Sequence, residues 1–188
     1  MSLPSSMKIA LKEWAVVCNA LAAGTQIILL RKGGIYEAAG EFEVEHAEFL
    51  LFPTYLHQDR EMVKPNLRDA VDKRVTEPGE IIISAAGVVT DIIQLQSRQQ
   101  MDRLENQHIW TPPLIDMRFN YRPENPLYLL LIRAYRLEVP QLIVNTPAYA
   151  GCKSWVPLEP PVDILRTAPA LDEQEFQKAR DQIIRLIN

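Results

Sequence analysis

Two long runs of branched and aromatic residues constrain the fold more than any other feature of the sequence. The first, IIISAAGVVTDIIQL, follows an EPGE turn and predicts one long bent strand or two strands hinged near Gly87. Branched side chains favour extended backbone, and a glycine permits a bend. The second, NPLYLLLIRAYRLEVP, is the strongest strand pattern in the chain. The protein is therefore expected to be organised around a β-sheet.

Shorter strands are expected on both sides of these runs. Their patterns occur in TQIILLRKGG, GEFEVEH, KSWVPLEPP and EFLLFP. We expect Pro53 to end the last of these strands, because proline lacks the backbone donor of a sheet ladder.

Helical patterns are interspersed among the strands. We expect a helix over MKIALKEWAVVCNALAAG that ends at Gly24, a short helix after Pro65, and a helix from Ser97, where Gln100 completes a capping box. The order lacks the regular alternation of a doubly wound sheet. It predicts a mixed α+β fold with a strongly bent sheet or a partly closed β-barrel, flanked by N- and C-terminal helices.

The C-terminal segment LDEQEFQKARDQIIRLIN predicts a helix that is capped by Asp172 and carries an apolar stripe. The stripe consists of Phe176, Ala179, Ile183 and Ile187. It must pack on its own domain or join two copies in a homodimer, because its exposure to water would be costly. We expect one α+β domain over residues 7–160, a proline-rich connector and this helix over 161–188, and an added leader at 1–6 before a native start at Met7.

Composition excludes several protein classes. The 188 residues are 47% hydrophobic and 23% charged, a balance unlike that of a disordered protein. We expect a cytoplasmic protein without a membrane segment, because no apolar run reaches about 18 residues and the start lacks a signal-peptide pattern. Cys18 and Cys152 show no CxxC spacing, which fits a reducing compartment. The net charge of −4 argues against non-specific coating of DNA but leaves room for a local basic groove.

Known catalytic and cofactor motifs are missing from the sequence. It contains no P-loop, no G-x-G-x-x-G spacing and no G-x-S-x-G elbow, so we expect no nucleotide cofactor and no α/β-hydrolase. His46, His57 and Glu45 could hold a metal if two strand ends meet. The plainer interpretation, which we favour, is that backbone groups hold each histidine and that there is no metal site.

A basic and aromatic set gives the best candidate for a binding site. It combines a turn at a strand end, a loop after Pro53 and a later lysine, with the members Arg31, Lys32, Gly33, Gly34, Thr54, Tyr55, His57, Gln58 and Lys153. Cations and backbone amides beside flexible glycines suit phosphates, and the loop adds donors and a stacking face. Further candidates are Arg118, Arg122, Arg133, Arg136 and Trp155. Alternatively, Arg133 and Arg136 pair with acids, and Trp14, Trp110 and Trp155 belong to the core.

Four segments resemble an uncharacterised bacterial family that is well represented in cyanobacteria and known only as a domain of unknown function. They are ALKEWAVVCNALAAGTQIILLRKGGI, FEVEHAEFLLFPTYLHQ, HIWTPPLIDMRFNYRPENPLYLLLIRAYRL and NTPAYAGCKSWVPL, with FLLFPTYLHQ the most specific. The family has been noted alongside restriction-endonuclease-type domains, so the resemblance implies a role in restriction-modification. In pattern, the two long runs also resemble small β-barrels of the PUA-like group, which read RNA or modified DNA bases.

Three functions follow as hypotheses. The first is a nucleic-acid-binding or recognition domain that serves a restriction or defence system and uses the Arg31–Gly34 turn and the Pro53–Gln58 loop. The second is a small metal-dependent or nucleotide-processing enzyme that uses His46 and His57. The third is a docking subunit for a restriction-type nuclease, with an exposed apolar patch on the C-terminal helix.

Overall fold

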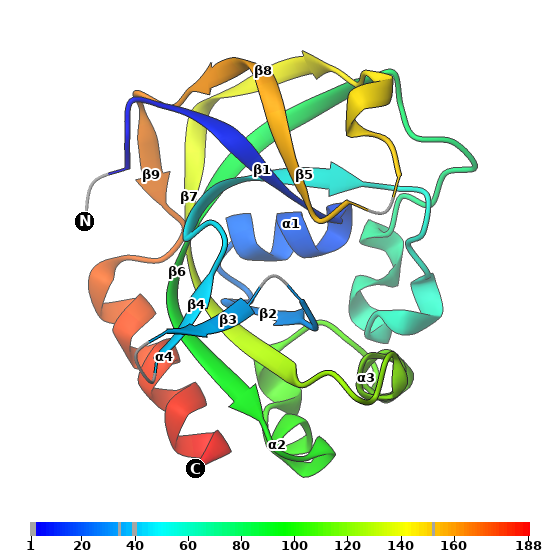
Figure 1. Ribbon diagram of the computed structural model, residues 1–188, viewed down its shortest axis with the longest axis vertical. Helices are drawn as coiled ribbons and strands as arrows, with labels where there is room; N and C mark the ends of the chain where they lie inside the picture. Colours follow the sequence, from blue (N-terminus) through cyan, green and yellow to red (C-terminus); the bar gives the residue numbers. More distant parts are fainter. Residues whose placement is uncertain (1–2, 34, 39–40, 152) are drawn as a thin grey trace.

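The computed structural model describes residues 3–33, 35–38, 41–151 and 153–188 (Figure 1). Its strands are β1 (Ser6–Trp14), β2 (Ile28–Arg31), β3 (Ile35–Ala38), β4 (Glu41–Val44), β5 (Glu48–Thr54), β6 (Glu80–Leu95), β7 (Leu127–Val144), β8 (Trp155–Asp163) and β9 (Thr167–Pro169). Its α-helices are α1 (Ala15–Ala22), α2 (Arg98–Arg103), α3 (Pro112–Asn120) and α4 (Glu173–Ile187). Short 3-10 helices are η1 (Arg60–Met62), η2 (Pro65–Ala70), η3 (Glu105–Gln107) and η4 (Pro147–Tyr149).

Within these residues one mixed sheet of seven strands dominates the fold. Its order is β2-β7-β6-β5-β1-β8, and β9 pairs with β7. The β1–β5 pair is parallel and the other pairs are antiparallel. The sheet bends strongly around α1, while α2, α3 and α4 lie at its periphery (Figure 1). The expected α+β class with a bent sheet flanked by helices is confirmed.

The two long runs form one extended ladder. β6 is a single strand of 16 residues, and its register with β7 shifts between Ile83 and Ala85 and again between Val89 and Asp91. Gly87 lies between these bulges, where a Cβ atom would come within 2.9 Å of both Phe49 and Ile132. The bend predicted near Gly87 is thus produced by bulges within one strand, and the glycine itself is needed for close packing.

The helix predicted for the N-terminal segment was wrong in its first half. The expected helix over MKIALKEWAVVCNALAAG begins only at Ala15, because residues 6–14 form β1 between β5 and β8. The apolar spacing of Ala10 and Trp14 fits a helix, but Ala10 and Leu11 are both fully buried. A strand covered on both faces buries consecutive residues, so its periodicity is hidden. Pro53 also differs from expectation, because it lies inside β5, opposite Glu13.

Several local expectations are confirmed. Gly24 has a φ of +72° and follows α1, where its amide and that of Thr25 bind carbonyls of the last turn, the geometry that ends helices at glycine. The predicted capping box at Ser97 is present, and Asp172 caps α4 as predicted, in a capping box with Glu175.

Helix α4 packs on its own chain. Phe176, Ile183 and Ile187 are buried, so the predicted stripe lies in the core. The helix is also fixed by polar contacts, since Arg180 binds both carboxylate oxygens of Asp91 at 2.5 and 2.8 Å. Of the two alternatives predicted for this stripe, packing on its own domain is therefore the one found, and the stripe is not exposed to a second copy or to a nuclease partner. Large exposed apolar side chains lie instead on the β6–β7 ladder, at Ile82, Val139, Leu142 and Val144.

The segment before α4 is tied to the sheet. The expected boundary between residues 160 and 161 lies inside β8, and β9, in the expected connector, pairs with β7 over Thr167–Pro169. No helix of the described residues is long and apolar enough to cross a membrane.

Candidate functional site

A pocket of about 710 Å³ opens where the ends of β1, β2 and β5 meet α3 and the segment before β8. Four basic and two acidic side chains of the described residues line it. With His57 neutral, the lining carries a net charge of +2, in contrast to −4 for the whole chain. The basic members are Lys12, Arg31, Arg118 and Lys153, and the acidic ones are Glu13 and Glu77. We call this site the basic pocket.

The end of β1 contributes an acid and an aromatic ring to the basic pocket. Trp14 is half-buried there and follows Glu13, which is only 8% exposed. The Glu13 carboxylate accepts a hydrogen bond from the Trp14 amide at 2.8 Å, and the Glu13 carbonyl accepts one from Thr54 Oγ1 at 3.1 Å. Phe52 and Tyr149, which also line the pocket, pack edge to face with each other. The lining is therefore partly aromatic, and its acid is held by hydrogen bonds to the backbone.

Three cationic side chains line the pocket wall. Within the part of the chain that the structure describes, the side chains of Arg31, Arg118 and Lys153 make no hydrogen bond and no ion pair. Burial lowers the pKa of Arg31, the charge of Glu13 opposes this shift, and the charge of Arg118 adds to it. Partly desolvated cations that repel one another attract an anion more strongly than fully solvated ones.

Some side chains at the end of β5 and in the loop after it line the pocket, and others hold the fold together. Thr54 and the exposed His57 line the pocket. Gln58 is fully buried, where its Oε1 accepts from the Val16 amide at 2.9 Å and its Nε2 donates to the Asp72 carbonyl at 2.8 Å. It thereby satisfies one of the free amides at the start of α1.

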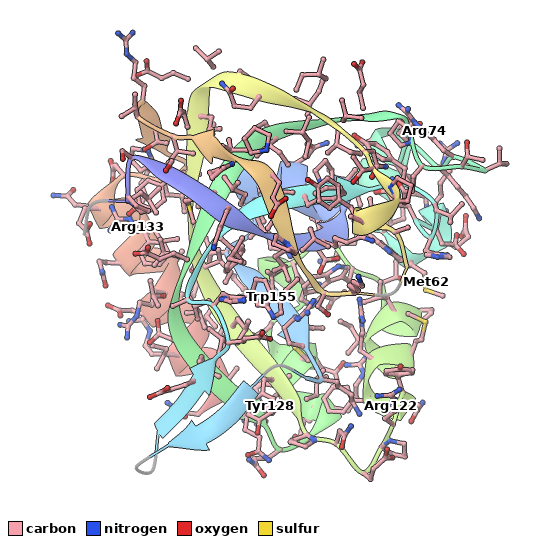
Figure 2. All side chains as sticks on the ribbon, turned by 45° about the horizontal axis from the view of Figure 1, so that its top comes forward. Met62, Arg74, Arg122, Tyr128, Arg133 and Trp155 are labelled. Carbon is pink, nitrogen blue, oxygen red and sulfur yellow. The ribbon has the colours of Figure 1, made fainter. Side chains whose placement is uncertain are left out.

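Tyr55 does not line the basic pocket. Its ring lies 4.6 Å from the Arg74 guanidinium, and its amide is held by Glu77 at 3.0 Å. Figure 2 shows Arg74 and Arg122 on one side of the molecule and Arg133 on the opposite side, beside α4. The predicted stacking face of Tyr55 is thus covered by an arginine.

One wall of the pocket, which we call the wall segment, is formed by residues 145–147, 149–151 and 153–154. Lys12 Nζ donates to the carbonyls of Tyr149 at 2.7 Å and of Gly151 at 2.8 Å. Asn145 anchors the other end through a 2.9 Å bond to the Pro78 carbonyl. Lys12 lines the pocket, but its ammonium serves mainly to clamp this wall.

The structure brings together only part of the predicted set. Arg31, Thr54, His57 and Lys153 share the basic pocket, while Lys32, Gly33, Tyr55 and Gln58 do not line it and Gly34 lies outside the described residues. Lys12 and Glu13 were not predicted as site residues, and Trp14 was expected in the core. The strand that carries them was interpreted as a helix, because burial on both faces leaves no alternation in its sequence.

Two further candidates, Trp155 and Arg133, serve the scaffold, as does Trp110. Trp110 is buried in the core. Trp155 makes edge-to-face contacts with the rings of Phe49 and His46. Arg133 forms an ion pair with Glu173, as the alternative interpretation expected.

The metal hypothesis finds little support. No group of three or more His, Cys, Asp or Glu side chains that could hold a metal occurs in the described part of the chain. His57 lines the basic pocket, whereas His46 lies 3.6 Å from Glu45 and against Trp155.

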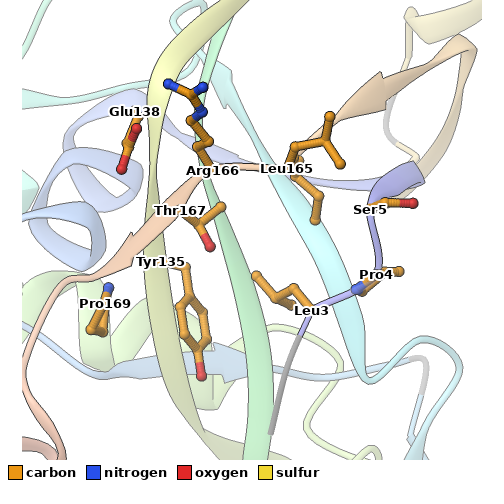
Figure 3. Close-up of a pocket in the computed structure, with 10 residues that line it drawn as sticks. Leu3, Pro4, Ser5, Tyr135, Glu138, Leu165, Arg166, Thr167 and Pro169 are labelled. Carbon is orange, nitrogen blue, oxygen red and sulfur yellow. The ribbon is translucent and has the colours of Figure 1, made fainter.

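A second pocket, of about 570 Å³, lies between β7, β9 and the N-terminal residues (Figure 3). Glu138 and Arg166 are the charged side chains of its described lining, and their charges cancel. The other side chains are mainly apolar, with Leu3 and Tyr135 facing each other in this view. The second pocket therefore lacks the positive charge that distinguishes the basic pocket.

Comparisons with known proteins give one family and a remote likeness in structure. ASCH from Zymomonas mobilis aligns with a TM-score of 0.44 at 12% identity, covering 92% of this chain and 93% of that chain. A tyrosine-to-phenylalanine mutant of that protein gives a TM-score of 0.47 at 12% identity, covering 92% of this chain and 96% of that one. Its serine-to-alanine mutant gives 0.45 at 12% identity, covering 95% and 98%. Because these TM-scores are below 0.5, nothing is carried over from ASCH.

No curated protein matches the chain. The model of one family, a domain of unknown function (DUF1802), matches residues 10–182, from within β1 into α4. The match spans nearly the whole sheet and the basic pocket, and the chain therefore belongs to this family.

Proposed function

We propose that this protein is a nucleic-acid-binding domain that takes a single-stranded segment into the basic pocket. The observation that carries the proposal is that the side chains of Arg31, Arg118 and Lys153, which form no ion pair among the described residues, share a pocket with the aromatic ring of Trp14. Single strands bind where cations meet the phosphates and aromatic rings stack on bases.

The buried acid of the pocket sharpens the proposal. Glu13 lines it, and its carboxylate is fixed by the Trp14 amide. A fixed acceptor beside a ring can take a hydrogen bond from a base edge, while the cations hold the backbone. The basic pocket thus offers groups of different kinds to the two halves of a nucleotide.

Fluorescence polarisation tests this function. Labelled single-stranded DNA, duplex DNA, modified-base duplex DNA and RNA are titrated at low salt, where phosphate contacts are strongest. We expect the single strands to bind, and Arg31→Gln/Arg118→Gln to lower their affinity by at least about tenfold, since charge-assisted hydrogen bonds contribute about 1.5–3 kcal/mol each.

The matched control is Lys178→Gln/Arg185→Gln, which removes the same charge from the exposed side of α4. Its affinity should stay near that of the wild type. Absence of binding to every probe at low salt would overturn the proposal, and equal losses in both variants would reduce it to a general charge effect.

The link to restriction-modification and to a nuclease partner remains a prediction from the family resemblance. Tagged protein that copurifies with the products of neighbouring genes would test it. Recovery of a nuclease from its native host is the expected result, and recovery of the protein alone would count against the link.

A further inference from the structure

Lys32 joins the end of β2 to the end of α3 just outside the basic pocket. Its Nζ donates to the carbonyls of Phe119 at 2.8 Å and of Arg122 at 3.1 Å. Arg31, the residue before Lys32, and Arg118, the residue before Phe119, both line the pocket. The turn after α3 is thus a direct continuation of the pocket wall.

This turn displays an aromatic ring and a cation to solvent. Tyr121 is 55% exposed, and the exposed Arg122 places its guanidinium carbon 5.3 Å from the centre of that ring. Tyr121 and Arg122 do not attach α3 to the core, because the buried side chains of this helix are Leu114 and Ile115.

The backbone of the turn is also unusual. Arg122 has a φ of +46°, the left-handed conformation that side chains other than glycine rarely adopt. Its carbonyl accepts from Lys32 Nζ and from the Asn125 amide at 2.9 Å, so two bonds hold the strained residue. Strain of this kind persists where surrounding structure enforces it and is frequent at binding sites.

We propose that Tyr121 and Arg122 form a second subsite, on which the strand leaving the basic pocket stacks its next base and rests its phosphate. The inference relies on the proposed function and specifies its ligand as a polymer that extends beyond the pocket, not a mononucleotide. Successive positive side chains from Arg31 and Arg118 to Arg122 match a continuous anionic backbone. An exposed aromatic ring stacks on any base, so this subsite adds affinity without selecting sequence.

Length dependence of binding tests the subsite. Labelled thymidine monophosphate and a labelled oligothymidylate of twelve residues serve as probes, and the variant is Tyr121→Ser/Arg122→Asn, because asparagine tolerates the left-handed conformation. We expect the affinity for the twelve-residue probe to fall about 5- to 150-fold, the range expected for one lost stacked base. The affinity for the mononucleotide, which the basic pocket holds alone, should stay unchanged.

The outcomes separate the two proposals. If the wild type binds and Arg31→Gln/Arg118→Gln does not, an unchanged affinity of the subsite variant for the long probe overturns the subsite and leaves the function standing. If the wild type binds neither probe, both fail. Tyr121→Phe keeps the ring and should retain the wild-type affinity, so a loss in this variant would also contradict stacking.

Discussion

Arginine side chains near α4 and α2 form ion pairs, whereas the arginines that line the basic pocket form none among the described residues. Beside α4, Arg180 is bound by Asp91 and Arg133 by Glu173, and near α2, Arg98 is bound by Asp102 and Asp116. In the basic pocket, Arg31 and Arg118 make no ion pair among the described residues. Acids are abundant in the chain, at 24 against 20 basic residues. The pocket arginines therefore lack ion pairs because no acidic side chain of the described residues lies close enough to them, not because acids are scarce.

The difference separates residues that hold the fold from residues available to a ligand. On the α4 side, burial raises the pKa of Asp91, but hydrogen bonds from Arg180 and Thr90 outweigh it and the net shift is downward. On the pocket side, burial lowers the pKa of Arg31 without a bonded partner. Scaffold changes should thus alter stability and leave binding intact, while pocket changes should do the reverse.

Gly87→Ala should have the largest effect on stability. The added Cβ would clash with the buried Phe49 and Ile132, both at 2.9 Å. We expect a loss of about 3 kcal/mol in the free energy of unfolding, near the top of the usual range for overpacking. Urea denaturation measures it, and a change below about 0.5 kcal/mol, the level of ordinary surface substitutions, would show that the ladder relaxes there.

Acid should destabilise the scaffold through His108. Burial, and then the charge of Lys64, lower the pKa of His108 to about 4 from the usual 6.5. Between these values the unfolded chain binds a proton that the native state does not, so stability falls as the pH falls below 6.5. We expect about 1.6 kcal/mol less stability at pH 5 than at pH 6.5, because the slope rises from half to nearly all of about 1.4 kcal/mol per pH unit over this interval.

The substitution that isolates this effect is His108→Gln. The variant should lose most of the slope between pH 5 and pH 6.5, a window above the ordinary pKa of carboxylates. If urea denaturation gives the same slope as in the wild type, His108 is not its source.

Arg180→Gln should destabilise the fold by a smaller amount. It leaves Asp91, whose side chain is 15% exposed, without its bidentate partner. The expected loss is about 1.5 kcal/mol, in the range for a charged hydrogen bond. Oligonucleotide affinity should not change. A loss of oligonucleotide affinity in Arg180→Gln, which does not line the basic pocket, would contradict the separation of scaffold residues from binding residues.

Lys12→Met should have the smallest effect on stability and a visible effect on binding. It removes the clamp on the Tyr149 and Gly151 carbonyls but keeps the apolar stem. We expect a stability change of about 1 kcal/mol or less. Hydrogen exchange should become faster at the wall segment, and affinity should fall a few-fold. Unchanged exchange there would show that the wall is held without Lys12.

Local chemistry made much of the fold predictable. Helix N-caps, Gly24 and the two long strand patterns depend on neighbouring residues, and each was located correctly. β1 was missed because its environment is set by β5 and β8, which are distant in sequence. A strand with both faces covered buries Ala10 and Leu11 in succession, so the sequence shows no alternation.

The candidate site was only partly predictable for the same reason. Arg31 and His57 could be selected because cations and donors gather at strand ends. Gln58 is also a polar side chain near a strand end, yet its Oε1 accepts a hydrogen bond from the amide of Val16, 42 positions away. Which polar side chains meet a backbone partner is decided by tertiary contacts, and these are not visible in the order of residues.

The salt dependence of oligonucleotide binding tests the central claim most directly. For single strands, each phosphate contact contributes about 0.7 to the slope of log affinity against log salt. The wild type and Arg31→Gln/Arg118→Gln are titrated with the twelve-residue probe over a series of salt concentrations. Our account predicts that the slope of the variant is smaller by about 1.4, the value for two lost phosphate contacts. Parallel lines for the two proteins would contradict it, because the pocket arginines would then contact no phosphate.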